Sequence, residues 1–403
     1  MKIEYIDIKN IAIPLLYKFD NSMPVVNFKL VFKASGSVRD ADKAGLAKLT
    51  AKLLNEGTKT HGVSEFSKAL EIKAIELYAG CGFETFTIEI NCLKEHFEYA
   101  LGLLESLLSD PNLTESTLEK IKTIAKGELA TKENDFDYQA KEELEKILFA
   151  NTPLANKMSY ESVDSISLDD IKNFLNELSL SNLYIVLAGD VSSDINLSKT
   201  LDALNSGIKT ELEVYKTSFD EITKFVKKES EQAYIYFGAP YNVPKDERYL
   251  SSVATFILGS SGFGSRLMEE IRVKRGLAYS IYARSSFNLS SSSIWGYMQT
   301  KNENKEEAIS VIKDEFLKFV RDGVSEEELK GAKNFLLGSV PLQKETMFQR
   351  VYIKEQEFYQ GLEFGEFERN LERVKNLDLK TLNEFIKSHD EILKLSFAVI
   401  YNE

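Results

Sequence analysis

Residues 45–58 read GLAKLTAKLLNEGT, and this stretch follows a strand-like run and a polar turn. The run VVNFKLVFKASG at 25–36 alternates apolar and polar residues with the period of a β-strand. The following pattern predicts a helix on which Lys48 and Lys52 lie one turn apart. A lysine ammonium has three hydrogen-bond donors and no lone pair, so this face of the helix repels a metal ion.

The segment resembles the zinc-binding helix of the pitrilysin/insulinase family of metallopeptidases, roughly G-L-A-H-x-x-E-H-x-L-x-x-G-T. Lys48 and Lys52 stand where the two histidine ligands belong, and Ala51 stands where the catalytic glutamate belongs. Glu128 falls at the place of the family's third ligand. A lone glutamate on a helix is usually a solvated surface residue, and beside two lysines we expect an ion pair in preference to a metal site. The other positions of the motif match the family's residues, at Gly45, Leu46, Ala47, Leu54, Gly57 and Thr58. The resemblance implies a protease scaffold that cannot cut peptides by zinc chemistry on its own.

Composition limits the partners and the compartment. The chain has 403 residues, a net charge of −13 and a pI near 5.1, which argues against nucleic acid and anionic membranes as partners. Neither a signal peptide nor an apolar stretch long enough to span a membrane is found, so we expect a cytoplasmic protein. Cys81 and Cys92 are not spaced as a metal or redox pair, and the three histidines lie far apart in sequence.

The sequence repeats itself at an offset of 211 residues. LTESTLEKIKTIAKG at 113–127 aligns with VSEEELKGAKNFLLG at 324–338, and YESVDSISL at 160–168 aligns with LERVKNLDL at 371–379. We therefore expect a duplicated α+β fold, in which two homologous α/β domains each pack helices on a mainly antiparallel sheet. The predicted boundaries are 1–210 for the first domain, 211–230 for a polar linker and 231–403 for the second domain.

The second half carries the run GSSGFGSRLMEEIRVKRGLAYSIY at 259–282. It resembles the second signature of the same family, roughly G-x-x-S-R-L-x-x-x-(I/L)-R-x-x-x-G-L-A-Y-x-(I/V). The matching Arg272 and Tyr279 would hold the substrate backbone and stabilise the developing oxyanion. A local interpretation stays open, in which Arg272 and its basic neighbours only favour a helix C-terminus that Gly276 closes.

In both motifs the chain resembles the non-catalytic, zinc-less subunit of the family's two-subunit peptidases. Such a chain is inactive alone and contributes Arg272 and Tyr279 to a zinc-bearing homologous partner that hydrolyses peptides. The chain itself would hold no cofactor, and zinc would be bound by the partner. One alternative is a binding or scaffold protein without a peptidase role, and another is a stand-alone peptidase with atypical ligands. The sequence leaves open whether the isolated chain forms a homodimer.

Overall fold

The first half of the sequence builds a six-stranded sheet in the order β1-β2-β6-β3-β5-β4. Its neighbouring strands are antiparallel except for β2 and β6, which run parallel. The strands are β1 (Lys2–Ile8), β2 (Ile11–Phe19), β3 (Val25–Lys33), β4 (Glu76–Cys81), β5 (Thr85–Leu93) and β6 (Leu183–Gly189). The run at 25–36 thus forms a strand, as its alternation predicts, and β3 lies inside the sheet.

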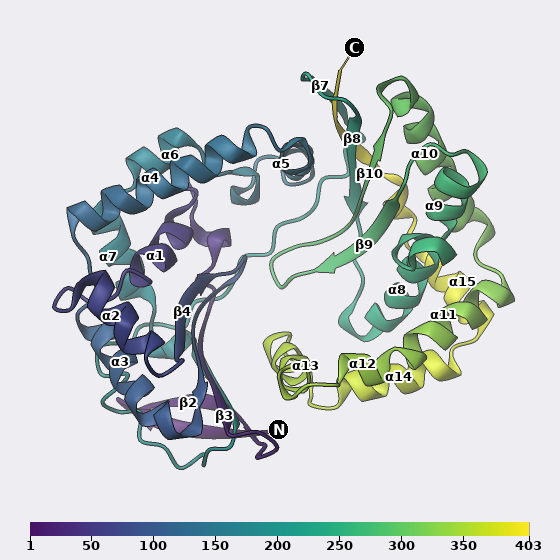
Figure 1. Ribbon diagram of the computed structural model, residues 1–403. Helices are drawn as coiled ribbons and strands as arrows, with labels where there is room; N and C mark the ends of the chain where they lie inside the picture. The colour runs from purple at the N-terminus through teal and green to yellow at the C-terminus, as the bar shows by residue number, and fades with distance from the viewer. Residues whose placement is uncertain (403) are drawn as a thin grey trace. The chain divides into compact units, whose positions relative to one another are not determined.

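The second half builds a five-stranded sheet in the order β7-β11-β8-β10-β9. Only β7 and β11 run parallel in it. The strands are β7 (Thr223–Lys227), β8 (Ala233–Pro240), β9 (Ile281–Phe287), β10 (Ser292–Thr300) and β11 (Ser396–Tyr401). Without β1, the order of the first sheet matches that of the second strand for strand, so the two halves share one α+β topology. Figure 1 shows strands and helices in both halves of the chain.

The computed structural model describes residues 1–402 and divides into two compact units. Unit 1 comprises Met1–Ala130, Asn156–Leu212 and Thr346–Tyr359. Unit 2 comprises Thr131–Ala155, Glu213–Glu345 and the residues from 360 onward. Each unit therefore takes a short segment from the other half of the sequence. The predicted linker at 211–230 contains strand β7, which is part of the second sheet.

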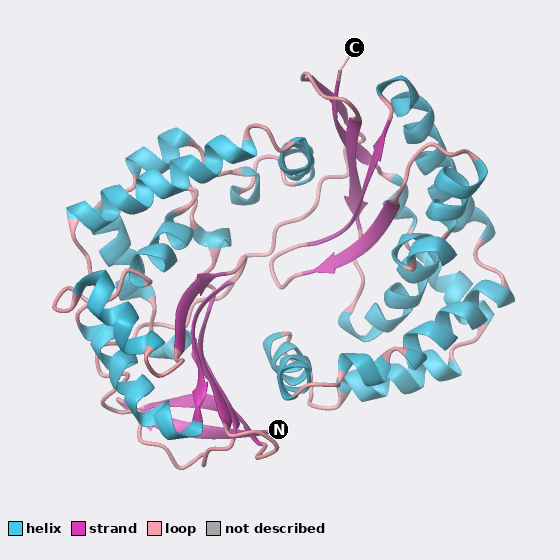
Figure 2. Cartoon of the chain, viewed as in Figure 1, coloured by secondary structure: helices cyan, strands magenta, loops and turns pink. Residues whose placement is uncertain are grey.

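Helices cover the sheets of both units (Figure 2). The helices of unit 1 are α1 (Leu46–Leu54), α2 (Gly62–Glu71), α3 (Phe97–Ser109), α4 (Glu115–Lys132), α6 (Tyr160–Ser165), α7 (Leu168–Glu177) and α13 (Met347–Tyr359). Those of unit 2 are α5 (Phe136–Leu148), α8 (Arg248–Thr255), α9 (Arg266–Met268), α10 (Lys305–Asp322), α11 (Glu326–Gly338), α12 (Val340–Gln343), α14 (Glu366–Asn376) and α15 (Leu379–Ser388). Within residues 1–402 no helix combines the length and the apolar character that a membrane crossing requires.

The repeat is visible in the helix starts. Helices α4 and α11 begin 211 residues apart, and so do α7 and α15. The predicted caps form at both α4 and α11: Thr114 Oγ1 accepts from the Thr117 amide, and Ser325 Oγ accepts from the Glu328 amide. One sequence pattern therefore produces the same local structure twice.

Helices α5 and α13 are also 211 residues apart, and each packs on the sheet of the other half. Helix α5 buries Leu144 and Leu148 against β8 and β11. Figure 1 shows α5 beside β8. Side chains alternate between the two faces of a strand. Tyr236 and Ala398, which contact α5, therefore face away from Phe237 and Val399 of the main core. Each buried leucine contributes about 1.5–3 kcal/mol to folding, so α5 is an integral part of unit 2.

Helix α13 is held on unit 1 by polar contacts, whereas α5 is held on unit 2 by buried leucines. The Lys29 ammonium binds the buried Glu355 carboxylate at 2.9 Å, and the Tyr184 hydroxyl donates to the same carboxylate at 3.2 Å. The Phe358 ring packs against the Tyr184 ring with centroids 5.1 Å apart. A buried carboxylate is stable only when it is paired and hydrogen-bonded, so these bonds fix α13 in register on the sheet.

Candidate functional site

Helix α1 starts at a tightly constrained turn. Gly45 has a φ of +103°, and a Cβ there would come within 2.8 Å of the Met158 side chain. The Asp40 carboxylate accepts hydrogen bonds from the backbone amides of Gly45 and Ala47, at 2.8 and 2.9 Å. At the other end, the Asn55 side chain exchanges two hydrogen bonds with the backbone of Ala79 in edge strand β4. Both ends of the helix are therefore held, which fixes the direction of its polar face.

That polar face carries a closed ion cluster. Lys48 Nζ lies 2.8 Å from Glu128 Oε2, and Lys52 Nζ lies 2.5 Å from Glu128 Oε1. Glu128 comes from α4, and the ion pair that the sequence predicts is confirmed. Ala51 lies buried between the two lysines in sequence and brings no polar group to the cluster. Both carboxylate oxygens are therefore occupied by ammonium groups.

The charges of this cluster do not suit a zinc ion. Burial opposes ionisation of Glu128, but the hydrogen bonds and charges of Lys48 and Lys52 lower the pKa of that carboxyl to about 2. The cluster then has two positive charges and one negative charge, and two of the three ligand positions have no lone pair to donate. Among residues 1–402 no group of three or more histidine, cysteine, aspartate or glutamate side chains is arranged to hold a metal ion.

The second motif lies on a rigid frame in unit 2. Ser265 caps the helix that begins at Arg266, and its hydroxyl accepts from the Met268 amide. The Arg266 guanidinium makes two hydrogen bonds to Glu328 of α11, at 2.6 and 2.8 Å, and a third to the Gly323 carbonyl. Paired bonds between arginine and a carboxylate are geometrically specific, so they set the orientation of the whole segment.

The helix continues through a wider π-helical turn, Glu269–Lys274, which includes Arg272. Such turns often occur at functional sites because they change the direction of side chains. Gly276 then adopts a φ of +64° and ends the helix, and the Leu277 amide bonds back to the Ile271 carbonyl. The chain turns here and brings residue 279 back toward residue 272.

Arg272 and Tyr279 lie together at the end of this turn. Arg272 Nη1 donates to the Tyr279 backbone carbonyl at 2.7 Å. The guanidinium lies 4.3 Å from the Tyr279 ring centroid and 4.4 Å from the Phe263 ring centroid. It therefore lies over both aromatic rings, in the distance range of cation–π contacts. Tyr279 is nevertheless 81% exposed and Phe263 is 66% exposed, so both rings remain open to a ligand.

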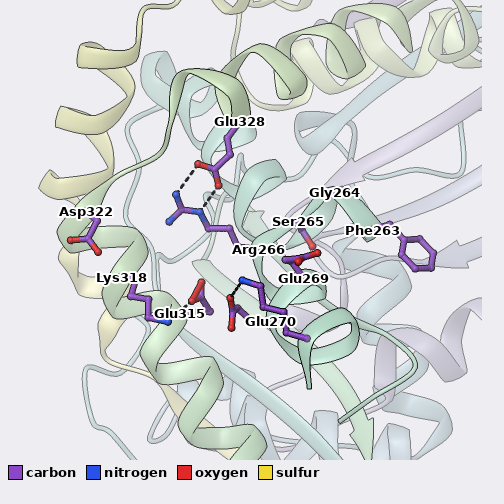
Figure 3. Close-up of a pocket in the computed structure, with 11 residues that line it drawn as sticks. Phe263, Gly264, Ser265, Arg266, Glu269, Glu270, Glu315, Lys318, Asp322 and Glu328 are labelled. Carbon is purple, nitrogen blue, oxygen red and sulfur yellow. Dashed lines mark hydrogen bonds and ion pairs between the residues drawn. The ribbon is translucent and has the colours of Figure 1, made fainter. Parts of the chain in front are cut away.

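A charged pocket of about 610 Å³ adjoins this stack, and Phe263 lies at its side (Figure 3). Most of its polar side chains are engaged with one another: Arg266 with Glu328, Lys318 with Glu315, and Lys274 with Glu270. The pocket is lined by Phe263, Gly264, Ser265, Arg266, Glu269, Glu270, Lys274, Glu315, Lys318, Asp322 and Glu328. Of these pairs, Arg266–Glu328 joins the segment before Arg272 to α11, whereas Lys318–Glu315 lies within α10 and Lys274–Glu270 lies within the π-helical turn.

The predicted residues thus form two groups in different units. Lys48, Lys52 and Glu128 come together in unit 1, and Arg272 and Tyr279 come together in unit 2. The sequence interpretation missed Phe263. Its only signal was an aromatic residue between two glycines, Gly262 and Gly264, in a segment that predicts a turn.

Comparison with known proteins identifies the class. Residues 16–162 match the family "Insulinase (Peptidase family M16)", and residues 165–336 match "Peptidase M16 inactive domain". The chain is 40% identical to the "Non-peptidase homolog YmxG" of Helicobacter pylori, over 98% of this chain and 94% of that protein. The chain belongs to the insulinase family of peptidases. It is also 24% identical to the "Uncharacterized zinc protease YmxG" of Bacillus subtilis, over 75% of both chains.

Solved structures share the fold. A peptidase M16 inactive domain from Pseudomonas fluorescens superposes with a TM-score of 0.88 at 22% identity, covering 100% of this chain and 98% of the other. The periplasmic protease PqqL of Escherichia coli superposes with a TM-score of 0.77 at 15% identity, covering 100% of this chain but 48% of that chain. These likenesses confirm the predicted α+β architecture.

Proposed function

We propose that this chain is a zinc-less, non-peptidase subunit of an insulinase-type enzyme, and that it contributes Arg272 and Tyr279 to a zinc-bearing homologous partner. The observation that carries the proposal is the contrast between the two motifs. Lys48, Lys52 and Glu128 satisfy one another, whereas Arg272 and Tyr279 are held together, with Arg272 half-buried and Tyr279 exposed. The substrate would be a short or unfolded peptide.

The two side chains suit a carbonyl oxygen that gains negative charge. A guanidinium has five N–H donors, and the only hydrogen bond formed by Arg272 among the described residues uses Nη1. The Tyr279 side chain adds an exposed hydroxyl donor. The contacts with the Phe263 and Tyr279 rings and the hydrogen bond to the Tyr279 carbonyl orient the guanidinium before a substrate arrives. Donors that are held in place in advance stabilise a developing oxyanion without reorganisation. The partner would supply the zinc centre.

The relatives support this proposal in two ways. The Helicobacter pylori protein is named a non-peptidase homologue, and we extend that description to this chain. The matched region makes up 48% of the PqqL chain, so two chains of the present length would equal one PqqL chain. That relation supports a pairing of this chain with a homologue of similar length.

The test starts with copurification from the cytoplasmic fraction, where the sequence predicts the chain to lie, followed by identification of the bound proteins by mass spectrometry. We expect an insulinase-family chain with an intact H-x-x-E-H motif among them. The two purified chains should be inert separately toward an unstructured fluorogenic peptide and active when mixed. Size-exclusion chromatography of the mixture measures assembly independently of activity.

Matched variants distinguish a chemical role from a structural one. Arg275 is three residues beyond Arg272 and Tyr5 is an exposed tyrosine of β1, so Arg275→Ala and Tyr5→Phe serve as controls. Loss of activity in Arg272→Ala and Tyr279→Phe, with assembly and both controls unchanged, supports the proposal. Full activity of both variants, or copurification without any zinc-motif homologue, favours the scaffold alternative.

A further inference from the structure

Unit 1 contains an apolar cavity of about 290 Å³ that has no part in the proposed function. It lies between the end of α1, the end of α3, helix α7 and the loop at 203–204. Its lining residues are Leu54, Ile88, Leu107, Leu108, Pro111, Leu113, Lys172, Leu175, Asn176, Leu178, Ala203 and Leu204. Ile88 belongs to strand β5 of the sheet and is fully buried, so the cavity reaches down to the core.

The cavity is polar on one side only. Lys172 and Asn176 are its two polar lining residues, and they lie one turn apart on α7. Both present N–H donors, and no acidic residue lines the cavity. Lys172 pairs with Asp169 at 3.1 Å, but this pair is exposed and such pairs are worth little, so a ligand can replace Asp169. The Asn176 backbone carbonyl already accepts from the Asn205 side chain.

We infer that this cavity binds a medium-chain carboxylate, with the hydrocarbon chain against the leucines and Ile88 and the carboxylate at Lys172. Two observations set this ligand class. The apolar walls favour a hydrocarbon body because burial of each CH₂ group contributes about 0.8 kcal/mol. The single cation of the lining, Lys172, has a partly exposed side chain and favours an anionic head group. The volume is at the low end of small-molecule sites, which fits one short chain and excludes a large cofactor.

Two probes with the same hydrocarbon chain test the inference. Octanoate and octan-1-ol differ only in the head group, and calorimetric titration of the full-length protein measures the affinity of each. We expect saturable binding of octanoate at one site per chain. Lys172→Gln should weaken octanoate binding about tenfold, because a charge-assisted hydrogen bond is lost, and should leave octan-1-ol binding unchanged. Lys380→Gln, which removes an exposed lysine of α15, is the matched control.

A blocking variant locates the binding site. Leu175→Trp should fill the cavity and abolish binding of both probes, and Ala203→Trp at the exposed loop is the second variant in case the first one unfolds. Thermal melting checks that each variant is folded. The inference is overturned if neither probe binds saturably, if folded blocking variants bind as the wild type does, or if Lys172→Gln weakens both probes equally.

Discussion

The two polar clusters of this chain differ in one physical respect. In unit 1, Lys48 and Lys52 pair with both oxygens of Glu128, so the cluster carries a net positive charge and has no acceptor left for an external cation. In unit 2, Arg272 is stacked and oriented but keeps donors that no described residue occupies, and Tyr279 is 81% exposed. Charged residues that pair with one another contribute to the stability of the fold. Donors that are oriented but have no hydrogen-bond partner remain available to a ligand. The same family scaffold thus has one closed site and one open site.

The largest effect should come from opening the closed site. Lys48→His together with Lys52→His restores two lone-pair ligands beside Glu128 and keeps Ala51, so a His₂Glu set forms. We expect the purified wild-type protein to hold no stoichiometric zinc and the double variant to retain about one Zn²⁺ per chain, as elemental analysis after dialysis measures.

Adding Glu128→Gln to the double variant should release that zinc. A double variant that folds but retains no metal would show that residues around α1 other than Lys48 and Lys52 also prevent zinc binding. Stoichiometric zinc in the wild-type protein would contradict the comparison directly.

The next effect concerns the open site. Tyr279→Phe deletes one hydroxyl and keeps the ring that stacks on Arg272. Loss of one oxyanion donor typically lowers kcat by about 10²–10³, and we expect a loss of that order in the mixed enzyme with little change in KM. Arg272→Ala should be at least as damaging and should also raise KM, because it would remove the contact that we propose Arg272 makes with the substrate backbone. Steady-state kinetics on the reconstituted pair measure both parameters.

A third prediction concerns the start of α1. Burial raises the pKa of Asp40 to about 6, although its carboxylate accepts from the Ala47 and Gly45 amides. Because the folded-state pKa lies above the unfolded value, the folded protein binds the proton more tightly, and stability decreases as the pH rises from about 4 to 6. The decrease attributable to Asp40 is about 2 kcal/mol.

Asp40→Asn should remove this dependence and flatten the plot of unfolding free energy against pH in that window. Urea unfolding of both proteins at several pH values measures it. Asp7→Asn, at an exposed position of β1, is the control and should leave the slope unchanged. An equal slope in the wild type and in Asp40→Asn would assign the pH dependence to other groups.

Much of the fold is predictable because it depends on local patterns. The 211-residue offset predicts the paired helices, and the caps at Thr114 and Ser325 follow from their residue types. The sequence does not show that α5 packs on the second sheet and α13 on the first sheet. An amphipathic pattern shows which face of a helix is apolar but not which sheet it covers. Strand β7 is also not predictable from the sequence, because TKFVK is an exposed edge strand without apolar alternation.

The candidate site divides in the same way. The lysines at 48 and 52 exclude a metal by their chemistry alone, so the closed cluster can be predicted from residue types. The contact of Phe263 with Arg272 joins residues on two separate turns of the chain, and Arg272 lies in the π-helical turn at Glu269–Lys274. A sequence pattern with a period of 3.6 does not indicate such a turn, so only the structure reveals the stack.

The smallest effect should come from weakening the closed cluster. Lys48 and Lys52 lower the pKa of Glu128 to about 2 against the opposing effect of burial, so its ionised form stabilises the folded state above about pH 4.5. That contribution is lost as the pH falls toward 2. The carboxylate is 35% exposed and screened by water, so Glu128→Gln should cost less than about 1 kcal/mol at pH 7.

Glu119→Gln, which removes an exposed glutamate of the same helix, is the control. The difference in unfolding free energy between wild type and Glu128→Gln should shrink between pH 5 and pH 3. A difference that stays constant over this range would show that the charge of Glu128 does not stabilise the fold, and that packing alone holds α1 against α4.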